Sequence, residues 1–466
     1  MPLLGKSASY DLIVIGSGPS GEKAAIQAAK LGKRVLVVER QPAPGGSCLH
    51  TGTIPSKTLR ESVRFIELMR RRQVYGISVH LDTNLTVDRL MHRKNAAILS
   101  LADRVQSTFE RNHVVYLNGE ARFEGPHQIT LTMAQGAEEQ FEAEHFFIAT
   151  GSRPYRPPNL DFNEPRVRDS DTILALHDIP RTLTIIGAGV IGCEYATIFS
   201  NLGVKVNLVN PRHVLLDFLD LEISNALAYL MRDSGVRIRL GENLERVETD
   251  ADHVYAHMKS GKVLKSDYLL FANGRSGNTE MLNLEAVGLQ ANQRQQLDVN
   301  AFYQTSVPHI YAVGDVIGAP SLAATSMEQG RLAALHAFGD LTEEPTTHLL
   351  PTGIYTIPEI STVGATEEKL TEDQVPYEVG SATYREIARG QIVGSTTGRL
   401  KLLFHRESLK LLGVHIIGDG ATDLVHIGQM VMGFDGTIEH FIDNVFNYPT
   451  YSECYRVAAL NGINRL

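Results

Sequence analysis

One short unit occurs twice in this chain, and it restricts the possible fold more than any other feature. In the first copy, an apolar run at 10–15 leads into the turn GSGPSG, a helical stretch and a second apolar run at 34–38 that ends at Glu39. The glycines of the turn are Gly16, Gly18 and Gly21. A strand, a glycine-rich turn, a helix, a strand and an acidic residue within about 30 residues are typical of a dinucleotide-binding βαβ unit.

The second copy follows in the same register. An apolar run at 183–186 precedes the turn GAGVIG, a helical stretch and a strand at 205–209, and the glycines are Gly187, Gly189 and Gly192. Asn210 stands where the first copy has Glu39. Such glycines let the backbone approach a pyrophosphate that rests on the helix N-terminus. The repeat predicts two dinucleotide sites, and two βαβ units without ligands are the alternative.

The rest of the chain alternates between helical and strand-like segments. Helices are predicted at 57–73 and 96–111, and strands at 268–273 and 310–313. From about residue 349 the alternating apolar pattern is typical of antiparallel strands, and helices follow it. The predicted fold class is α/β, with two Rossmann-like dinucleotide-binding domains and a C-terminal α+β domain.

Composition argues against several other classes of protein. The chain has 44 Lys and Arg against 53 Asp and Glu, a net charge of −9, and no basic block, which disfavours nucleic acid or an anionic membrane as partner. Three Cys are too few for a disulfide scaffold, and the 17 His show no metal-ligand spacing. No apolar run has the length of a membrane span or a signal peptide. We expect a soluble cytoplasmic protein without a metal site.

Further motifs, taken together with the two βαβ units, resemble the flavoprotein disulfide reductase family, which includes glutathione reductase and dihydrolipoamide dehydrogenase. The resemblance covers nearly the whole chain. Its motifs are GGSCLHTGTIPSK at 45–57, ATGSRP at 149–154, YAVGD at 311–315 and NYPTYSE at 447–453. The resemblance implies FAD in the first site and NAD(P)H in the second. It also implies a homodimer, or a larger homo-oligomer, in which the C-terminal segment of one subunit completes the active site of the other.

The same resemblance implies four segments. Residues 1–157 would form the first part of the FAD-binding domain and residues 158–278 the NAD(P)-binding domain. Residues 279–347 would complete the FAD site, and residues 348–466 would form the dimerisation domain.

Site residues follow from the matched motifs. The resemblance implies that Glu39 binds the adenosine ribose of FAD and that Asp315 accepts hydrogen bonds from the ribityl chain. The remaining FAD-binding residues would be Gly16, Gly18, Gly21, Arg40, Gly45, Gly46, Ser47, Cys48, Lys57, Ala121, Thr150, Gly151 and Ala323. The NAD(P)-binding residues would be Gly187, Gly189, Gly192, Asn210 and Arg212.

Lys57 and Glu194 are the implied catalytic pair. The resemblance places Lys57 near flavin N5, paired with Glu194. A cation there stabilises the reduced ring, and a carboxylate keeps the lysine charged and oriented. Two surface charges on separate helices are the alternative.

Two positions depart from the family pattern. The reductases carry two cysteines five residues apart, but here Cys48 is followed by Thr53, which cannot form or exchange a disulfide. The family also places a proton-shuttling His before Pro-Thr, where this chain has Tyr448, while the orienting acid remains as Glu453. A tyrosine with an ordinary pKa near about 10 is a poor acid–base partner for a thiol. Cys48 is expected to pack against the flavin, and a reactive thiol is the alternative.

With these departures, the sequence resembles one branch of the family, the soluble pyridine nucleotide transhydrogenases, which move hydride from NADPH to NAD⁺ through FAD. The expected function is therefore a reversible, ping-pong NAD(P)⁺ transhydrogenase that works through flavin N5, with NADPH, NADH, NAD⁺ and NADP⁺ as partners. A disulfide reductase like dihydrolipoamide dehydrogenase and a non-catalytic flavin-binding assembly protein are the alternatives.

Nucleotide choice is expected to depend on the end of the second βαβ unit. A carboxylate there would repel the 2′-phosphate of NADP, whereas Asn210 can donate or accept a hydrogen bond. Arg212 could approach that phosphate. The alternative is an ordinary surface turn after the strand.

Overall fold

The computed structural model describes residues 9–71, 76, 85–339, 341, 343 and 349–466. The chain divides into two compact units. The first comprises 1–58, 91–155 and 274–346, and the second comprises 59–90, 156–273 and 347–466. The division into compact units does not show which ligand each unit binds. The division into FAD, NAD(P), central and dimerisation segments therefore stays a prediction.

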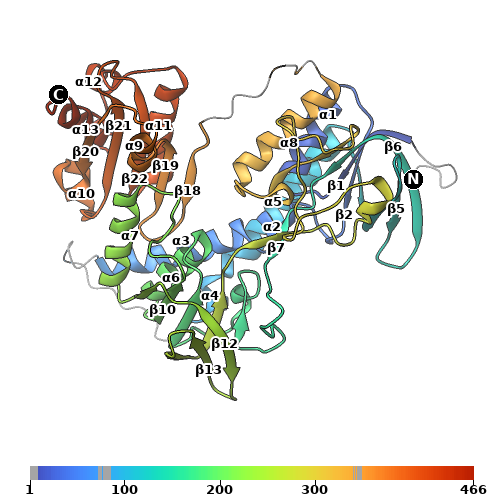
Figure 1. Ribbon diagram of the computed structural model, residues 1–466, viewed down its shortest axis with the longest axis horizontal. Helices are drawn as coiled ribbons and strands as arrows, with labels where there is room; N and C mark the ends of the chain where they lie inside the picture. The colour runs from blue at the N-terminus through green and yellow to red at the C-terminus, as the bar shows by residue number, and fades with distance from the viewer. Residues whose placement is uncertain (1–8, 72–75, 77–84, 340, 342, 344–348) are drawn as a thin grey trace. The chain divides into compact units, whose positions relative to one another are not determined.

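The first unit contains a seven-stranded sheet (Figure 1). Its parallel part has the order β3-β2-β1-β6-β17, and β5 and β4 extend β6 as an antiparallel meander. The strands are β1 (Ser9–Ile15), β2 (Val35–Glu39), β3 (Val115–Asn118), β4 (Glu120–Gly125), β5 (Gln128–Thr132), β6 (Glu138–Ile148) and β17 (Ile310–Ala312). A two-stranded sheet pairs β7 (Ser152–Pro154) with β16 (Arg275–Gly277).

Both faces of this sheet are covered. Along β1, Ile13 and Ile15 enter one apolar cluster while Leu12 and Val14 enter another, as expected for a strand whose side chains alternate between two buried faces. The helices are α1 (Pro19–Lys30), α2 (Gly46–His50), α5 (His92–Arg111) and α8 (Ala323–Phe338), with short turns η3 (Leu284–Val287) and η4 (Gly314–Ile317). Helices α1 and α8 lie side by side (Figure 1).

The second unit repeats this plan. Its parallel sheet has the order β11-β10-β9-β15-β8, and a three-stranded antiparallel sheet β12-β13-β14 stands where the first unit has its meander. The strands are β8 (Val167–Arg168), β9 (Thr182–Ile186), β10 (Lys205–Asn210), β11 (Arg237–Leu240), β12 (Leu244–Thr249), β13 (Val254–Met258), β14 (Val263–Ser266) and β15 (Tyr268–Phe271). The helices are α4 (Val87–Leu90), η2 (Ile173–Ala175), α6 (Val190–Asn201) and α7 (Leu221–Asp233).

The C-terminal part of the second unit is an antiparallel sheet of order β18-β19-β22-β21-β20, drawn mainly in red (Figure 1). Its strands are β18 (Thr352–Ile354), β19 (Ile360–Gly364), β20 (Tyr377–Thr383), β21 (Arg399–His405) and β22 (Leu411–Ile417). The helices are α9 (Glu367–Glu372), η5 (Tyr384–Glu386), α10 (Ala388–Val393), α11 (Ala421–Gly433), α12 (His440–Asp443) and α13 (Glu453–Ile463). The predicted class, α/β with two Rossmann-like domains and a C-terminal α+β domain, is confirmed.

Some element boundaries differ from the prediction. Helix α1 begins at Pro19, inside the predicted turn GSGPSG, because proline suits the first helical turn after Gly18. The segment 45–57 is helical over much of its length, in α2 and the start of α3 (Thr53–Arg71), and the predicted end of α3 at Gln73 lies outside the described residues. Across the described ranges, no helix has both the length and the apolarity that a membrane crossing needs.

Candidate functional site

The first glycine-rich turn has little spare space except at its middle glycine. Gly16 has φ +106°, and a Cβ there would overlap the carbonyl of Ala149. A Cβ on Gly21 would overlap the carbonyl of Gly16, which fixes the close packing of α1 on the strand end. For Gly18 the nearest atom is the Cα of Gly46, 3.9 Å from the added Cβ position. The opening at Gly18 is where a pyrophosphate would approach.

The second turn has the same arrangement. Gly187 also has φ +106°, and an added Cβ would lie 2.7 Å from the carbonyl oxygen of Ala272. A Cβ on Gly192 would overlap the carbonyl of Gly187, whereas nothing described lies within 4 Å of one on Gly189. Gly18 and Gly189 are each the N-cap of the following helix, so the first amides of α1 and α6 have no capping side chain. Both turns can therefore hold a phosphate.

Glu39 ends β2 beside the first turn. Its buried Oε2 accepts hydrogen bonds from the Ser17 amide at 3.0 Å and the Ser17 hydroxyl at 2.7 Å. The amide of Gln41 donates to Oε1 at 2.9 Å. These donors hold the carboxylate at the carboxyl end of the parallel strand, where ligands of such sheets bind. A carboxylate in this place suits a ribose hydroxyl.

Asp315 lies on η4 next to a pair of polar residues from the small sheet β7-β16. Its Oδ2 accepts a hydrogen bond from the Ser152 hydroxyl at 2.7 Å and lies 4.0 Å from Nε of Arg275. Among the described residues, Oγ1 of Thr150 is buried without a hydrogen-bond partner. An orphaned buried hydroxyl is costly unless a ligand satisfies it. Together with the opening at Gly18, it shows that the first site fits a dinucleotide such as FAD.

The other predicted FAD-binding residues also lie in the first unit. Ala121 is buried in β4, Ala323 is the first residue of α8, and Arg40 is an exposed residue directly after β2. Gly45 and Gly151 both have positive φ, and the Gly45 amide donates to the Ser17 hydroxyl at 3.1 Å. Whether each contacts FAD stays a prediction.

Cys48 and Thr53 face each other across the start of α3. Cys48 belongs to α2, Thr53 is the first residue of α3, and a hydrogen bond joins their side chains. Burial raises the pKa of the Cys48 thiol, and the hydrogen bond from Thr53 opposes part of that rise. The other two cysteines, Cys193 and Cys454, are buried free thiols. Thr53 thus stands beside Cys48 where a second redox thiol would be needed.

In the second unit, Asn210 holds the loop that follows β10. Its Nδ2 donates to the Val214 carbonyl at 2.9 Å, so the carboxamide is oriented by the loop itself. The exposed guanidinium of Arg212 forms an ion pair with Asp217. Asp217 is a residue that sequence reasoning missed, because nothing in its local pattern distinguishes it from other surface acids. To reach a 2′-phosphate, the guanidinium of Arg212 would have to break its ion pair with Asp217 or bind Asp217 and the phosphate at the same time.

Glu194 is buried on α6, the helix of the second glycine-rich turn. Its Oε1 accepts a hydrogen bond from the Tyr355 amide at 2.9 Å. This partner could not be predicted from the sequence. Every residue except proline carries a backbone amide, and no sequence feature distinguishes the amide of Tyr355 as the donor to Glu194. Lys57 belongs to the first unit and Glu194 to the second, so their pairing stays a prediction.

The C-terminal motif presents an exposed tyrosine and a partly buried acid. The side chain of Tyr448 is 73% exposed. In the described ranges, Oε2 of Glu453 is buried without a hydrogen-bond partner. The family's orienting acid is therefore present, but its His is replaced by a tyrosine that faces solvent in the single chain.

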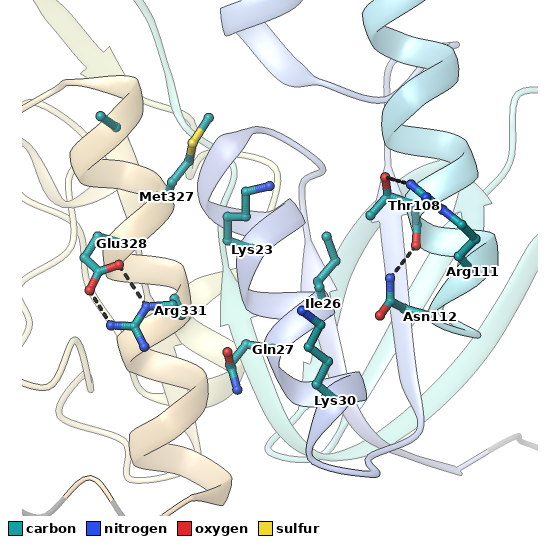
Figure 2. A pocket seen from close by; sticks show the side chains of 11 residues that line it. Lys23, Ile26, Gln27, Lys30, Thr108, Arg111, Asn112, Met327, Glu328 and Arg331 are labelled. Carbon is teal, nitrogen blue, oxygen red and sulfur yellow. Dashed lines mark hydrogen bonds and ion pairs between the residues drawn. The ribbon is translucent and has the colours of Figure 1, made fainter.

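Two other features are separate from the predicted residues. An open hollow of about 640 Å³ lies between α1, α5 and α8, and Figure 2 shows Lys23, Lys30 and Arg111 around it.

In the second unit, the described residues offer one acidic group with metal-like geometry, formed by Asp220, Glu222 and Glu367, but the ammonium of Lys401 already binds it. We call these four residues the Lys401 cluster.

Comparison with family models gives two matches. Residues 10–330 match the pyridine nucleotide-disulphide oxidoreductase model, and residues 350–459 match the dimerisation domain of pyridine nucleotide-disulphide oxidoreductases. Together these two matches span most of the chain.

Curated relatives resemble the chain over its whole length. It is 52% identical over 474 residues to a soluble pyridine nucleotide transhydrogenase of Enterobacter sp. (strain 638), with 99% of each chain covered. It is 51% identical over 467 residues to the protein of the same name from Shigella flexneri, again with 99% of each covered.

Solved structures share the fold. The HOCl-induced flavoprotein disulfide reductase RclA from Escherichia coli, as its Cu(II) complex, aligns with a TM-score of 0.88 at 27% identity, covering 97% of this chain and 99% of that one. LpdA from Mycobacterium tuberculosis aligns with a TM-score of 0.89 at 25% identity, covering 96% of this chain and 99% of its own.

Proposed function

The chain belongs to the pyridine nucleotide-disulphide oxidoreductase family, and from that premise we propose that it is a transhydrogenase that moves hydride reversibly between NADPH and NAD⁺. The observation that carries the proposal is the pairing of Cys48 with Thr53. A thiol that faces a hydroxyl cannot pass electrons to a disulfide substrate. The shared name of the full-length relatives gives the proposal independent support.

FAD and the nicotinamide dinucleotide are proposed to bind at separate sites, one in each unit. FAD, when bound, supplies a ring that accepts and returns hydride. In the first unit, the opening at Gly18 admits the pyrophosphate, Glu39 holds a ribose, and Asp315 with Thr150 offers further polar contacts. In the second unit, the opening at Gly189 admits the nicotinamide dinucleotide. The described part of the second unit has one such turn, which supports the proposal that NADPH and NAD⁺ bind the same site one after the other, in ping-pong order.

Lys57 and Glu194 are proposed to tune this transfer. The Lys57 ammonium stabilises the negative charge that arrives with hydride, and Glu194 orients that ammonium. Hydride exchange between two nicotinamide nucleotides needs no protein acid or base. The replacement of the family's His by Tyr448 is consistent with that requirement.

Disulfide substrates separate the proposal from a disulfide reductase. We expect no measurable turnover of lipoamide or glutathione disulfide, because the Cys48 thiol has no thiol partner and its raised pKa keeps it protonated near neutral pH. Adding one equivalent of NADPH should give no long-wavelength thiolate–flavin absorbance band. Thr53→Cys alone should not create a good reductase, because Tyr448 still replaces the His. Rapid reduction of either disulfide by the unaltered protein would contradict the proposal.

Nucleotide choice gives a second prediction. Asn210→Glu should weaken the use of NADPH more than that of NADH, because a carboxylate beside the 2′-phosphate costs on the order of a few kcal/mol. Arg212→Ala should shift the preference the same way by about 1–3 kcal/mol, the value of a charge-assisted hydrogen bond. Asp217→Asn is the matched variant, since it frees Arg212 and should favour NADPH. Values of kcat/KM for both nucleotides decide, and equal changes for both would place the choice elsewhere.

We also propose a homodimer located in the cytoplasm. The match of residues 350–459 to a dimerisation domain supports the first part, and so does a set of exposed apolar side chains in that region, namely Met430, Phe434, Val445 and Leu460. The second part is supported by the word "soluble" in the names of the relatives.

A further inference from the structure

The turn between β18 and β19, residues 355–359, is bound on one side by α3. Nη2 of Arg60 lies 3.1 Å from Oε2 of Glu359 and 3.2 Å from the carbonyl oxygen of Thr356. The guanidinium carbon lies 5.9 Å from the centre of the Tyr355 ring. Arg60 therefore contacts the turn through a carboxylate, a carbonyl and an aromatic face.

The same turn is also bound by α6. The Tyr355 amide donates to Oε1 of Glu194 at 2.9 Å, and the Ile357 amide donates to the Thr197 hydroxyl at 3.2 Å. That hydroxyl in turn donates to the carbonyl of Glu194 at 2.9 Å. Two amides of the turn, those of Tyr355 and Ile357, thus reach the carboxylate of Glu194 and the helical turn that carries it.

The ion pair that holds this turn is almost fully buried. The side chains of Arg60 and Glu359 are 3% and 5% exposed. A buried pair contributes little net stability compared with apolar residues of the same size, so stability alone is a weak reason for it. Nη1 of Arg60 also pairs with Glu61, whose side chain is 59% exposed, while Nη2 reaches the buried carboxylate of Glu359, where little water can replace it. Such a pair is suited to fixing the position of the segment between its partners.

We propose that Arg60 and Glu359 are positioning residues for Glu194. They hold the β18–β19 turn so that the Tyr355 amide donates to the Glu194 carboxylate. A hydrogen bond to a carboxylate oxygen fixes the direction in which the carboxylate points. The inference rests on the proposed function, in which that carboxylate orients Lys57, and it assigns a role to residues outside the family's own site motifs.

The chain offers a matched control for this ion pair. Arg64 lies one helical turn further along α3, and its Nη2 lies 3.3 Å from Oδ1 of Asp419, outside the β18–β19 turn. Arg64→Met removes an ion pair between the same helix and the same part of the second unit. It is expected to leave the Tyr355 amide and the hydride-transfer rate within about twofold of the unaltered protein, as for a partly exposed pair.

The first measurement is amide hydrogen exchange in the FAD-loaded protein. In Arg60→Met the peptide that carries the Tyr355 and Ile357 amides should exchange roughly tenfold faster, because the turn loses its anchor on α3. Glu359→Gln should act in the same direction. The single variant Arg60→Met leaves the carboxylate of Glu359 buried without this partner. If that variant does not fold, the double variant R60M/E359M, which removes both charges, is measured instead. Exchange equal to that of Arg64→Met would overturn the proposal.

The second measurement is a double-mutant cycle on the rate at which NADPH reduces bound FAD. Arg60→Met should slow this step roughly tenfold in the unaltered background and by less than about twofold when Glu194→Ala is already present, since its effect passes through Glu194. Equal slowing in both backgrounds would overturn the positioning role. If the unaltered protein transfers no hydride to NAD⁺, the proposed function fails instead, and the exchange measurement still tests the contact.

Discussion

Lys57→Met should reduce the rate of hydride transfer from NADPH to bound FAD by roughly 100-fold, the usual cost of removing one group that stabilises developing charge. The flavin potential should fall as well, because the negative charge that arrives with hydride loses its cation. Glu194→Gln should give a weaker version, since the lysine remains but loses its orienting carboxylate. Stopped-flow absorbance of the reductive half-reaction and a potentiometric titration measure the two effects.

Lys30→Met is the matched control for this prediction. Lys30 is an exposed lysine of the same unit, at the end of α1, and none of the predicted FAD-binding residues is adjacent to it in sequence. FAD content and dimer formation should stay unchanged in all these variants. An unaltered rate of flavin reduction in Lys57→Met, with FAD still bound, would remove Lys57 from the mechanism and leave it a structural residue.

Lys401→Met should lower the free energy of unfolding by about 3–5 kcal/mol, the cost of leaving a buried charge without its partner. Nζ of Lys401 lies 2.8 Å from Oδ1 of Asp220 and 3.1 Å from Oε2 of Glu222, and it also pairs with Glu367. The lysine is fully buried. These contacts join α7, which follows the loop of Asn210, to α9 and β21 of the C-terminal sheet. Denaturant unfolding of the FAD-loaded protein measures the loss.

Lys369→Met provides the comparison for the Lys401 cluster. Lys369 also pairs with two acids, Glu372 and Asp373, but all three lie on the solvent side of α9 or just after it. Its removal should change stability very little, as for most exposed ion pairs. A loss in Lys401→Met no larger than that in Lys369→Met would show that the buried cluster does not hold α7 to the C-terminal sheet.

The two dinucleotide folds could be predicted because their determinants are local. A left-handed φ at Gly16 and Gly187, and the lack of space for a Cβ at Gly21 and Gly192, act within a few residues of the turn. The spacing of those glycines therefore carries much of the steric requirement, while the close approach of Ala149 to Gly16 and of Ala272 to Gly187 comes from distant parts of the chain. The replacement of a redox cysteine by Thr53 was equally visible, since the two positions lie five residues apart.

The ion pairs that organise the second unit could not be predicted in this way. Lys401 stands in an alternating strand, where a lysine normally indicates a solvated face, and only the folded chain brings Asp220 to it. The face of β21 with Leu400, Leu402 and Phe404 enters the apolar core, so Lys401 points to the opposite face. The pairing of Arg60 with Glu359 could not be predicted for the same reason. Such pairs leave no recognisable spacing in the sequence, because Asp220 and Lys401 are 181 residues apart and Arg60 and Glu359 are 299 residues apart.

The central claim is tested most directly by mixing the purified FAD-loaded protein with NADPH and an NAD⁺ analogue whose reduced form absorbs at a longer wavelength. We expect the analogue to be reduced mole for mole as NADPH is consumed, without any added disulfide. Initial rates at several concentrations of both nucleotides should give parallel double-reciprocal lines, as ping-pong order requires. NADPH oxidation that leaves the analogue unreduced, or that proceeds only when a disulfide is added, would contradict the account.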